Sequence, residues 1–333
     1  MTPPLEMRAR FLEHTGARYP IIGGAMYQIS SPNLVAHMAR AGILGEIQPV
    51  SFTFTHRTPL PEAFEIMQTI SPGPYGINVL VEGTDEHRRQ GLAWLDIALA
   101  HGCRFITTAL GKPTAIVERA REYGAVVYHK VTNLGHARRA IEAGVDGLIA
   151  VNSRAGGHAG AFTKEELFIQ LTPFGVPLIC AGGIGDEHAF CEALQLGYAG
   201  VLMGTRFIAS KEAPAPETYK RAIIGASEDD IISTPKVQIG VPLAVIRTPG
   251  IARLGTTFSP VEQFMLQTPN RKRWLRRWYS LASGQPWEKI KRGQFSEEAL
   301  WSAGKSVTGI TAIEEIGEIV ERFVARGREA GVL

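Results

Sequence analysis

The 333-residue sequence is poor in cysteine, in net charge and in long apolar runs. Its three cysteines, Cys103, Cys180 and Cys191, have no metal-binding spacing, and so sparse and odd a set favours a reducing compartment over a disulfide scaffold. With 35 basic and 32 acidic residues, the net charge of +3 is too small to indicate a nucleic-acid partner by itself. No run approaches the roughly 18 apolar residues of a membrane span, and the N-terminus lacks an apolar signal core, so we expect a cytoplasmic protein with no membrane partner.

Several catalytic motifs are absent as well. There is no HExxH and no cluster of cysteine and histidine, so we expect no catalytic metal. The absence of G-x-S-x-G and of a Walker A motif argues against a serine hydrolase and a P-loop nucleotidase. No G-x-G-x-x-G follows the first apolar segment, which weakens the case for a doubly wound dinucleotide-binding sheet.

What the sequence does contain is an alternation of apolar and helical segments. Eight nearly continuous apolar segments predict buried strands at 19–26, 43–47, 75–81, 104–110, 125–131, 147–151, 176–181 and 200–203. Alternating strands and helices favour parallel pairing with right-handed crossovers, and eight such units in about 190 residues match the size of a TIM barrel. We therefore predict an α/β fold, a (β/α)8 TIM barrel, with a doubly wound open sheet as the alternative.

The strand pattern stops after Ser210, and the rest of the chain is predicted to be mostly helical, with frequent prolines. We expect an added C-terminal helical domain or a cover over the barrel mouth. The predicted organisation is a barrel over 1–225, a helical substrate-covering segment over 226–310, and a C-terminal helix over 311–333 that packs back on the barrel. The basic segment Arg271–Arg277 favours a solvated face or an acidic partner over nucleic acid, and its role is left open.

Two neighbouring predicted strands end in glycine. One leads into Gly182 and Gly183, and the next leads into Gly204 and Thr205. In TIM barrels such a pair of strand ends holds a phosphate, because glycine lets an anion approach the backbone N–H groups where a helix begins. We interpret this stretch as a phosphate site, and the phosphate as that of a flavin.

Other predicted strand ends carry polar residues, where barrel enzymes place their active sites. Asn78 is one of them. Lys130 is costly to bury unless it meets an anion, which is either a barrel carboxylate or a flavin. His158 lies in the glycine-rich loop RAGGHAG, so its imidazole either enters the mouth and exchanges protons near neutral pH or bonds to the loop backbone. His129 can face the core or the helices, and its role is left open.

The motifs YPIIGGAM, YGINV, YHKV, AGGHAG, LICAGGIGD and LMGTRFIASKEAP together resemble the nitronate monooxygenase family, formerly called 2-nitropropane dioxygenases. That family includes FMN-dependent enoyl-acyl-carrier-protein reductases and NADH:quinone reductases. The resemblance covers about residues 18–225 and implies an FMN-binding TIM barrel with a helical domain over the flavin. The first motif departs from the family pattern, because GGAM has alanine where many relatives have a third glycine.

The resemblance implies cofactor-binding residues in two groups and one catalytic residue. The group at the flavin ring and ribityl chain comprises Ala25, Met26, Asn78 and Lys130. The group at the phosphate comprises Gly157, Gly182, Gly183, Gly204 and Thr205. The catalytic residue is His158, which matches a histidine implicated in substrate handling.

The function expected from the resemblance is an FMN-dependent oxidoreductase, a nitronate monooxygenase that oxidises alkyl nitronates with O2. The alternative is an NAD(P)H-dependent FMN reductase of quinones or enoyl thioesters, for which Arg271–Arg277 offers a basic docking face. A flavin-free phosphate-binding barrel is a third hypothesis. The sequence gives neither the physiological substrate, nor the use of NAD(P)H, nor the oligomeric state, for which a homodimer is one option.

Overall fold

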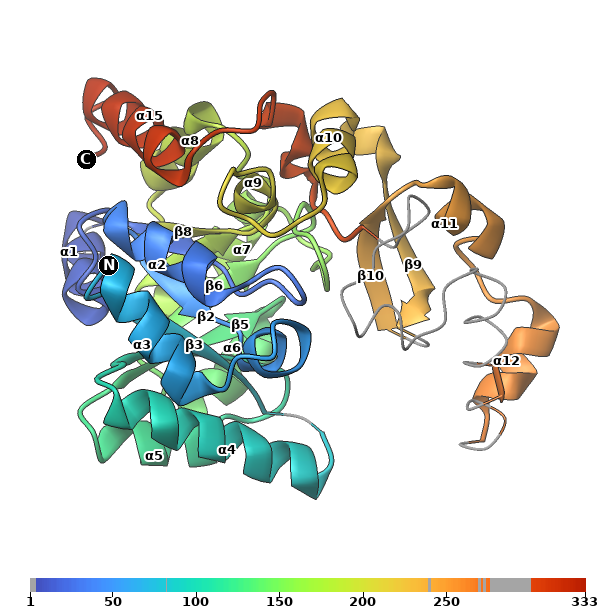
Figure 1. Ribbon diagram of the computed structural model, residues 1–333, viewed down its shortest axis with the longest axis horizontal. Coiled ribbons are helices and arrows are strands. Elements are labelled where there is room, and N and C mark those ends of the chain that lie inside the picture. The colour runs from blue at the N-terminus through green and yellow to red at the C-terminus, as the bar shows by residue number, and fades with distance from the viewer. Residues whose placement is uncertain (1–3, 82, 239–240, 269–270, 272–273, 276–300) are drawn as a thin grey trace.

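Eight parallel strands close into a barrel in sequence order, with the first strand pairing with the eighth (Figure 1). The computed structural model describes residues 4–81, 83–238, 241–268, 271, 274–275 and 301–333. The barrel strands are β1 (Ile21–Gly23), β2 (Leu44–Ile47), β3 (Tyr75–Leu80), β4 (Phe105–Ala109), β5 (Val126–Val131), β6 (Gly147–Val151), β7 (Leu178–Ala181) and β8 (Gly200–Met203). The predicted TIM barrel is confirmed.

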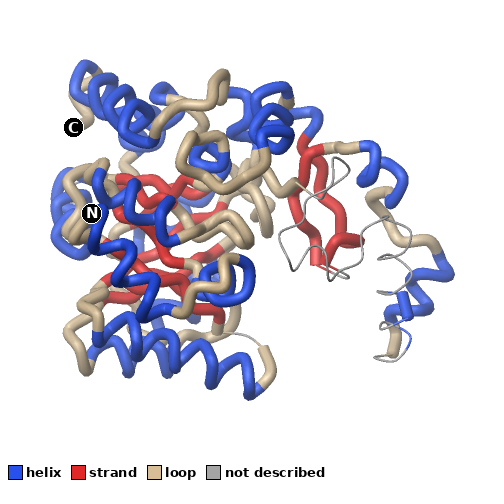
Figure 2. The backbone as a smooth tube through the Cα atoms, in the orientation of Figure 1, coloured by secondary structure: helices blue, strands red, loops and turns tan. Residues whose placement is uncertain are grey.

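Helices alternate with these strands and surround them, as Figure 2 shows in blue around red. They are α1 (Pro4–Thr15), α2 (Pro32–Arg40), α3 (Leu60–Ile70), α4 (Asp85–Ala100), α5 (Thr114–Arg121), α6 (Leu134–Glu142), α7 (Lys164–Leu171), α8 (Glu187–Leu196), α9 (Thr205–Ile208) and α10 (Glu217–Gly225). Ser31 caps α2 as its Ser-Pro start predicts, because its side chain accepts a hydrogen bond from the Leu34 N–H. No helix in the described part is long and apolar enough to cross a membrane.

The barrel interior is a packed core at its N-terminal end. Successive strand residues point to opposite faces, so alternate positions of each strand face inward. The lower inward layer is apolar and completely or almost completely buried, and α1 closes it from below with one aromatic ring. The layer comprises Phe11, Ile22, Leu44, Phe105, Tyr128, Ile149 and Ile179. The inward positions two residues further along the strands therefore form the floor of the mouth.

A two-stranded antiparallel hairpin follows the barrel: β9 (Ile231–Gln238) and β10 (Val241–Ile246). It departs from the mostly helical segment predicted after Ser210. Pro235 and Pro242 suggest helix breaks in the sequence, yet each strand of a two-stranded sheet is an edge, where proline is tolerated. The hairpin, α11 (Pro249–Leu254) and α12 (Pro260–Leu266) lie on the side of the barrel away from α1 (Figure 1).

The chain returns to the barrel through residues 301–315 and ends in α15 (Ile316–Glu329). The C-terminal helix predicted over 311–333 is present as α15, which begins five residues later than predicted and ends at Glu329. Its buried face, which includes Ile316, Ile319, Val320 and Phe323, has the spacing of an amphipathic helix. This face packs against α8 and α2.

Candidate active site

Four polar side chains form one side of the floor of the barrel mouth. Glu46 on β2, Asn78 on β3, Thr107 on β4 and Lys130 on β5 occupy the inward positions directly above the apolar layer. Asn78 and Thr107 are register partners, which brings their side chains together across two neighbouring strands. Asn78 and Lys130 were predicted from the sequence, whereas Glu46 and Thr107 were missed.

Lys130 is held by two partners. Its Nζ lies 2.9 Å from Asn78 Oδ1 and 3.3 and 3.4 Å from the two carboxylate oxygens of Glu46. The Lys130 side chain keeps 19% of its surface exposed, while that of Glu46 has none. The barrel ion pair, one of the two alternatives for Lys130, is therefore present, and part of the Lys130 side chain stays exposed.

Glu46 is also the acceptor for the loop after β1. The backbone N–H of Ala25 donates to Oε2 of Glu46, and the Thr107 hydroxyl donates to Oε1. Thr107 Oγ1 lies 3.2 Å from Asn78 Oδ1 as well. The signal that could have found Glu46 is the one that found Lys130, a charged residue inside an apolar strand, which must meet an opposite charge to be buried.

Met26 links this polar side to the end of β8. It is buried, and its backbone N–H donates to Ser30 Oγ at 2.9 Å. A Cβ added to Gly204 would lie 3.5 Å from Met26 Cγ, so the two strand ends are in contact. Ala25 and Met26 thus lie between two sides of the mouth. The polar side is the one formed by the four side chains on β2 to β5, and the glycine side is the one formed by the loops after β6, β7 and β8, which carry Gly157, Gly182, Gly183 and Gly204.

The glycine side depends on backbone conformations that other residues rarely adopt. Gly182 has φ of +114° and Gly183 has φ of +79°. A Cβ on Gly182 would lie 2.4 Å from Asn152 Oδ1, far inside van der Waals contact. Asn152 is fully buried, accepts from the Arg154 N–H at 2.8 Å and donates to the Gly182 carbonyl at 3.0 Å. This side chain, which was not predicted, ties the loop after β6 to the end of β7.

The returning segment completes the glycine side. The Gly304 N–H donates to Thr205 Oγ1 at 3.1 Å, and the Lys305 N–H donates to the Arg154 carbonyl at 2.9 Å. A Cβ on Gly304 would lie 2.5 Å from the backbone nitrogen of Gly156. The sequence reasoning missed this loop, whose only local signal is the glycine of Ala303-Gly304-Lys305-Ser306.

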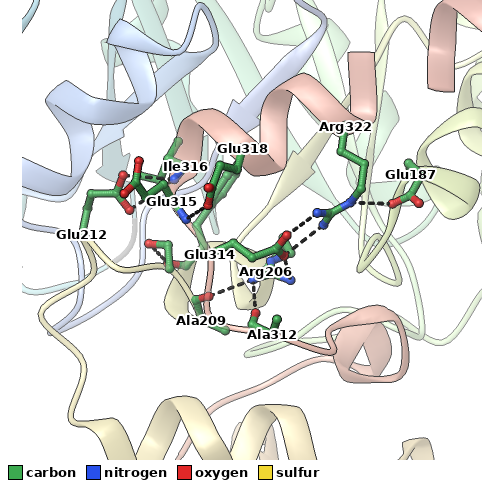
Figure 3. Close-up of polar contacts among 12 residues, drawn as sticks. Glu187, Arg206, Ala209, Glu212, Ala312, Glu314, Glu315, Ile316, Glu318 and Arg322 are labelled. Atoms are coloured by element: carbon green, nitrogen blue, oxygen red, sulfur yellow. Dashed lines mark hydrogen bonds and ion pairs between the residues drawn. The ribbon is translucent and has the colours of Figure 1, made fainter. Parts of the chain in front are cut away.

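A buried arginine fastens this returning segment to α9 (Figure 3). Arg206 follows Thr205 and is almost wholly buried; its Nη2 donates to the carbonyls of Ala209 and Ala312, each at 2.8 Å. Its Nη1 lies 3.3 Å from Glu314, and Arg322 also pairs with that carboxylate. Burial lowers the pKa of Arg206 to about 10, which still leaves it protonated at neutral pH. The C-terminal segment is thereby held beside the ends of β7 and β8.

His158 lies at the boundary between the barrel and the hairpin. It is an exposed residue of the loop between β6 and α7. The neighbouring Gly157 has φ of +69°, and its carbonyl accepts from the Ala244 N–H of β10 at 2.8 Å. A Cβ added to Gly157 would meet no atom within 4 Å, so the space beside it is open. The hairpin thus fixes the loop that carries His158 and Gly157.

His129 faces away from the mouth. It precedes Lys130 on β5 and therefore points outward, into the layer between strands and helices. It is buried, and its Nδ1 lies 2.7 Å from Thr108 Oγ1. Burial, helped by the charges of His136 and Lys130, lowers its pKa to about 4. Of the two orientations left open by the sequence, His129 takes the one toward the helices.

The basic segment Arg271–Arg277 falls mostly outside the described residues. Within it, Arg271, Trp274 and Leu275 are described. The Arg271 guanidinium lies over the Phe264 ring of α12, 4.1 Å from its centroid. The docking role considered for this segment stays a prediction.

Comparison with known proteins gives four informative matches. A family model described as nitronate monooxygenase matches residues 8–326. The "(3aS,4S,5R,7aS)-5-hydroxy-7a-methyl-1-oxo-octahydro-1H-indene-4-carboxyl-CoA dehydrogenase" of Mycobacterium tuberculosis is 28% identical over 75% of this chain and 69% of its own length. A "Probable nitronate monooxygenase" of Staphylococcus saprophyticus is 27% identical over 79% of this chain and 85% of its own length. The structure of FabK from Thermotoga maritima superposes with a TM-score of 0.78 at 25% identity, covering 97% of this chain and 96% of that chain.

Proposed function

Since the chain belongs to the nitronate monooxygenase family, whose model spans residues 8–326, we propose that it is an FMN-dependent oxidoreductase that oxidises alkyl nitronates with O2. The observation that carries this proposal is the division of one barrel mouth into a glycine side and a polar side. FMN carries a phosphate at one end and a flavin ring at the other. The phosphate requires close approach to backbone N–H groups, and the ring requires hydrogen-bonding side chains.

The residues present fit the two ends of FMN. At Gly182 and Gly183 the positive φ angles, and at Gly157 the open space, let an anion approach the backbone closely. Gly204 and Thr205 would hold the same phosphate from the end of β8. Lys130 and Asn78 offer a charged donor and an amide at the other end, where ring oxygens and nitrogens require hydrogen bonds. Ala25 and Met26 would line the ring between the two sides.

The bound flavin would supply the redox chemistry, accepting an electron pair from the substrate and passing it to O2. The chain's residues would supply position and charge. Lys130, kept in place by Glu46 and Asn78, presents a fixed cation to the mouth. His158, on its loop beside the open space, would donate a hydrogen bond to a nitronate oxygen or take a proton from a neutral nitroalkane.

A thioester substrate is the second candidate, because the Mycobacterium tuberculosis relative is named as a carboxyl-CoA dehydrogenase. In this case the FMN and its residues stay the same and the reaction partner changes. The chain would be an NAD(P)H-dependent reductase of enoyl thioesters or quinones, or an oxidoreductase of another CoA ester.

Oxygen uptake and anaerobic reduction separate the two candidates. The purified protein is given a small alkyl nitronate in air, and in a separate sample NADH or NADPH without oxygen. We expect oxygen consumption with the nitronate, and a flavin absorbance that NAD(P)H leaves unbleached. Rapid bleaching by NAD(P)H with no oxygen uptake on nitronate would overturn the first candidate and favour the second. A colourless protein that takes up no FMN would overturn both.

A further inference from the structure

Glu46 is a buried charge that the motifs of the family resemblance leave without a role. We propose that Glu46 is a positioning residue that neutralises Lys130 and fixes the Ala25 N–H, and so keeps the midpoint potential of the bound flavin low. This inference rests on the proposed FMN site. It concerns the electrochemistry of that site and is independent of which substrate the enzyme uses.

Glu46 is the residue of the polar side that accepts hydrogen bonds from three separate segments of the chain. Its two oxygens accept from three donors: the Ala25 N–H, the Thr107 hydroxyl and the Lys130 ammonium. An ionised carboxylate can satisfy all three at once, because it carries about four acceptor positions and no donor. The three donors come from the loop after β1, from β4 and from β5, so this one side chain orders most of the polar side.

The charges of Glu46 and Lys130 should affect the midpoint potential of the bound flavin. Glu46 and Lys130 form an ion pair at the floor of the mouth, in which the Glu46 side chain is fully buried and the Lys130 side chain is 19% exposed. The pair is neutral as a whole. Reduction adds negative charge to a flavin, so an uncompensated cation next to it favours the reduced form, and a nearby anion opposes this. Removing the charge of Glu46 alone should therefore raise the potential.

Glu46→Gln removes the negative charge of Glu46 but keeps a side chain of nearly the same shape. The amide oxygen can still accept from the Ala25 N–H, and the NH2 group can donate to Thr107 Oγ1. The Thr107 hydroxyl can then turn its proton to Asn78 Oδ1, which already lies 3.2 Å away. The Lys130 ammonium keeps Asn78 Oδ1 and the amide oxygen as acceptors, whereas its 3.4 Å contact with the second oxygen of Glu46 is lost. Glu46→Gln thus removes the negative charge and this one long hydrogen bond.

The test is an anaerobic reductive titration of the FMN-loaded protein against a reference dye of known potential. We expect Glu46→Gln to raise the preference for reduced over oxidised FMN about tenfold, a rise of about 30 mV for a two-electron couple. Lys130→Met should lower the potential, because it removes the cation. Thr107→Val, which changes one hydrogen bond and no charge, is the matched control and should leave the potential near the wild-type value.

The outcomes distinguish this inference from the proposed function. If wild-type protein binds FMN and Glu46→Gln leaves the potential unchanged or lowers it, the role of Glu46 is wrong and the flavin site stands. If wild-type protein binds no FMN, the proposed function itself fails. Should Glu46→Gln not fold, the double variant Glu46→Gln/Lys130→Met replaces it: its potential must lie above that of Lys130→Met, and equal potentials would contradict the proposal.

Discussion

The two sides of the barrel mouth are built by different means. On β2 to β5 the inward positions carry Glu46, Asn78, Thr107 and Lys130, so this side works through side-chain charge and hydrogen bonds. After β6 to β8 the loops carry glycines, so that side works through backbone conformation and close approach. Substitutions should therefore act through lost pairing on the polar side and through strain and steric clash on the glycine side.

Lys130→Met should have the largest effect on stability. It leaves the Glu46 carboxylate buried without its cation, and breaking a buried pair in this way costs roughly 3–5 kcal/mol. Urea unfolding of the FMN-free protein measures the loss. Thr107→Val keeps both charges and should cost only about 1 kcal/mol. Equal losses of unfolding free energy in Lys130→Met and Thr107→Val would contradict the claim that charge pairing stabilises the polar side.

Gly182→Ala should be the strongest lesion on the glycine side. Its φ of +114° and a Cβ placed 2.4 Å from Asn152 Oδ1 combine backbone strain with overpacking, together about 4 kcal/mol. FMN affinity, measured by fluorescence quenching, should fall with it. Gly175→Ala, in the turn before β7 and at the opposite end of that strand from Gly182, is the matched control: its φ of +67° is also positive but no atom lies within 4 Å, so strain alone, about 1–2 kcal/mol, is expected. A control as damaging as Gly182→Ala would show that steric fit is not the cause.

His129 lies on the outer face of β5, where protonation of a buried side chain should lower the stability of the fold. Its folded-state pKa is about 4, against about 6.5 in an unfolded chain, so between these values the unfolded state binds more protons. Stability should thus rise with pH across this window, and up to about 3 kcal/mol should be lost as pH falls through it.

His129→Asn should flatten this slope, as followed by urea unfolding at several pH values. His188→Asn changes an exposed histidine on α8 and serves as its control, with the wild-type slope expected. A wild-type slope in His129→Asn would mean that other groups carry the pH dependence.

Asn152→Ala should have the smallest effect of the four, about 1–3 kcal/mol, because it removes from a buried position the hydrogen bonds to Gly182 and Arg154 and a longer one to Cys180 Sγ. It should also weaken FMN binding, since Asn152 holds the loop after β6 against Gly182. Thermal unfolding and FMN titration measure both effects. Ser153→Ala, at the neighbouring partly buried residue, is the control. If Asn152→Ala bound FMN as tightly as wild type, the glycine side would not depend on this loop.

The barrel and its family could be predicted because their signals are local. Each strand is a short apolar run, and the motifs at the strand ends are contiguous in sequence. Lys130 could be found by the cost of burying a charge, and Glu46 was missed although the same argument applies to it. The structure adds that both side chains point into one barrel and meet there.

The remaining features could not be predicted because they depend on distant contacts. Gly304 donates a hydrogen bond to Thr205, which lies 99 residues earlier in the chain, and the sequence near either residue does not indicate this contact. The β9–β10 hairpin carries prolines that resemble helix breaks, and its place is set by the Gly157–Ala244 bridge. The outward direction of His129 follows from strand register, which a single apolar segment does not fix.

FMN retention measures the central claim, that the two sides of the mouth hold one flavin. Wild-type protein, Gly182→Ala and Gly175→Ala are each loaded with FMN, desalted and scanned for visible absorbance. We expect wild-type protein to keep one FMN per chain, Gly175→Ala to keep most of it, and Gly182→Ala to lose it. A folded wild-type protein that emerges colourless would contradict the account.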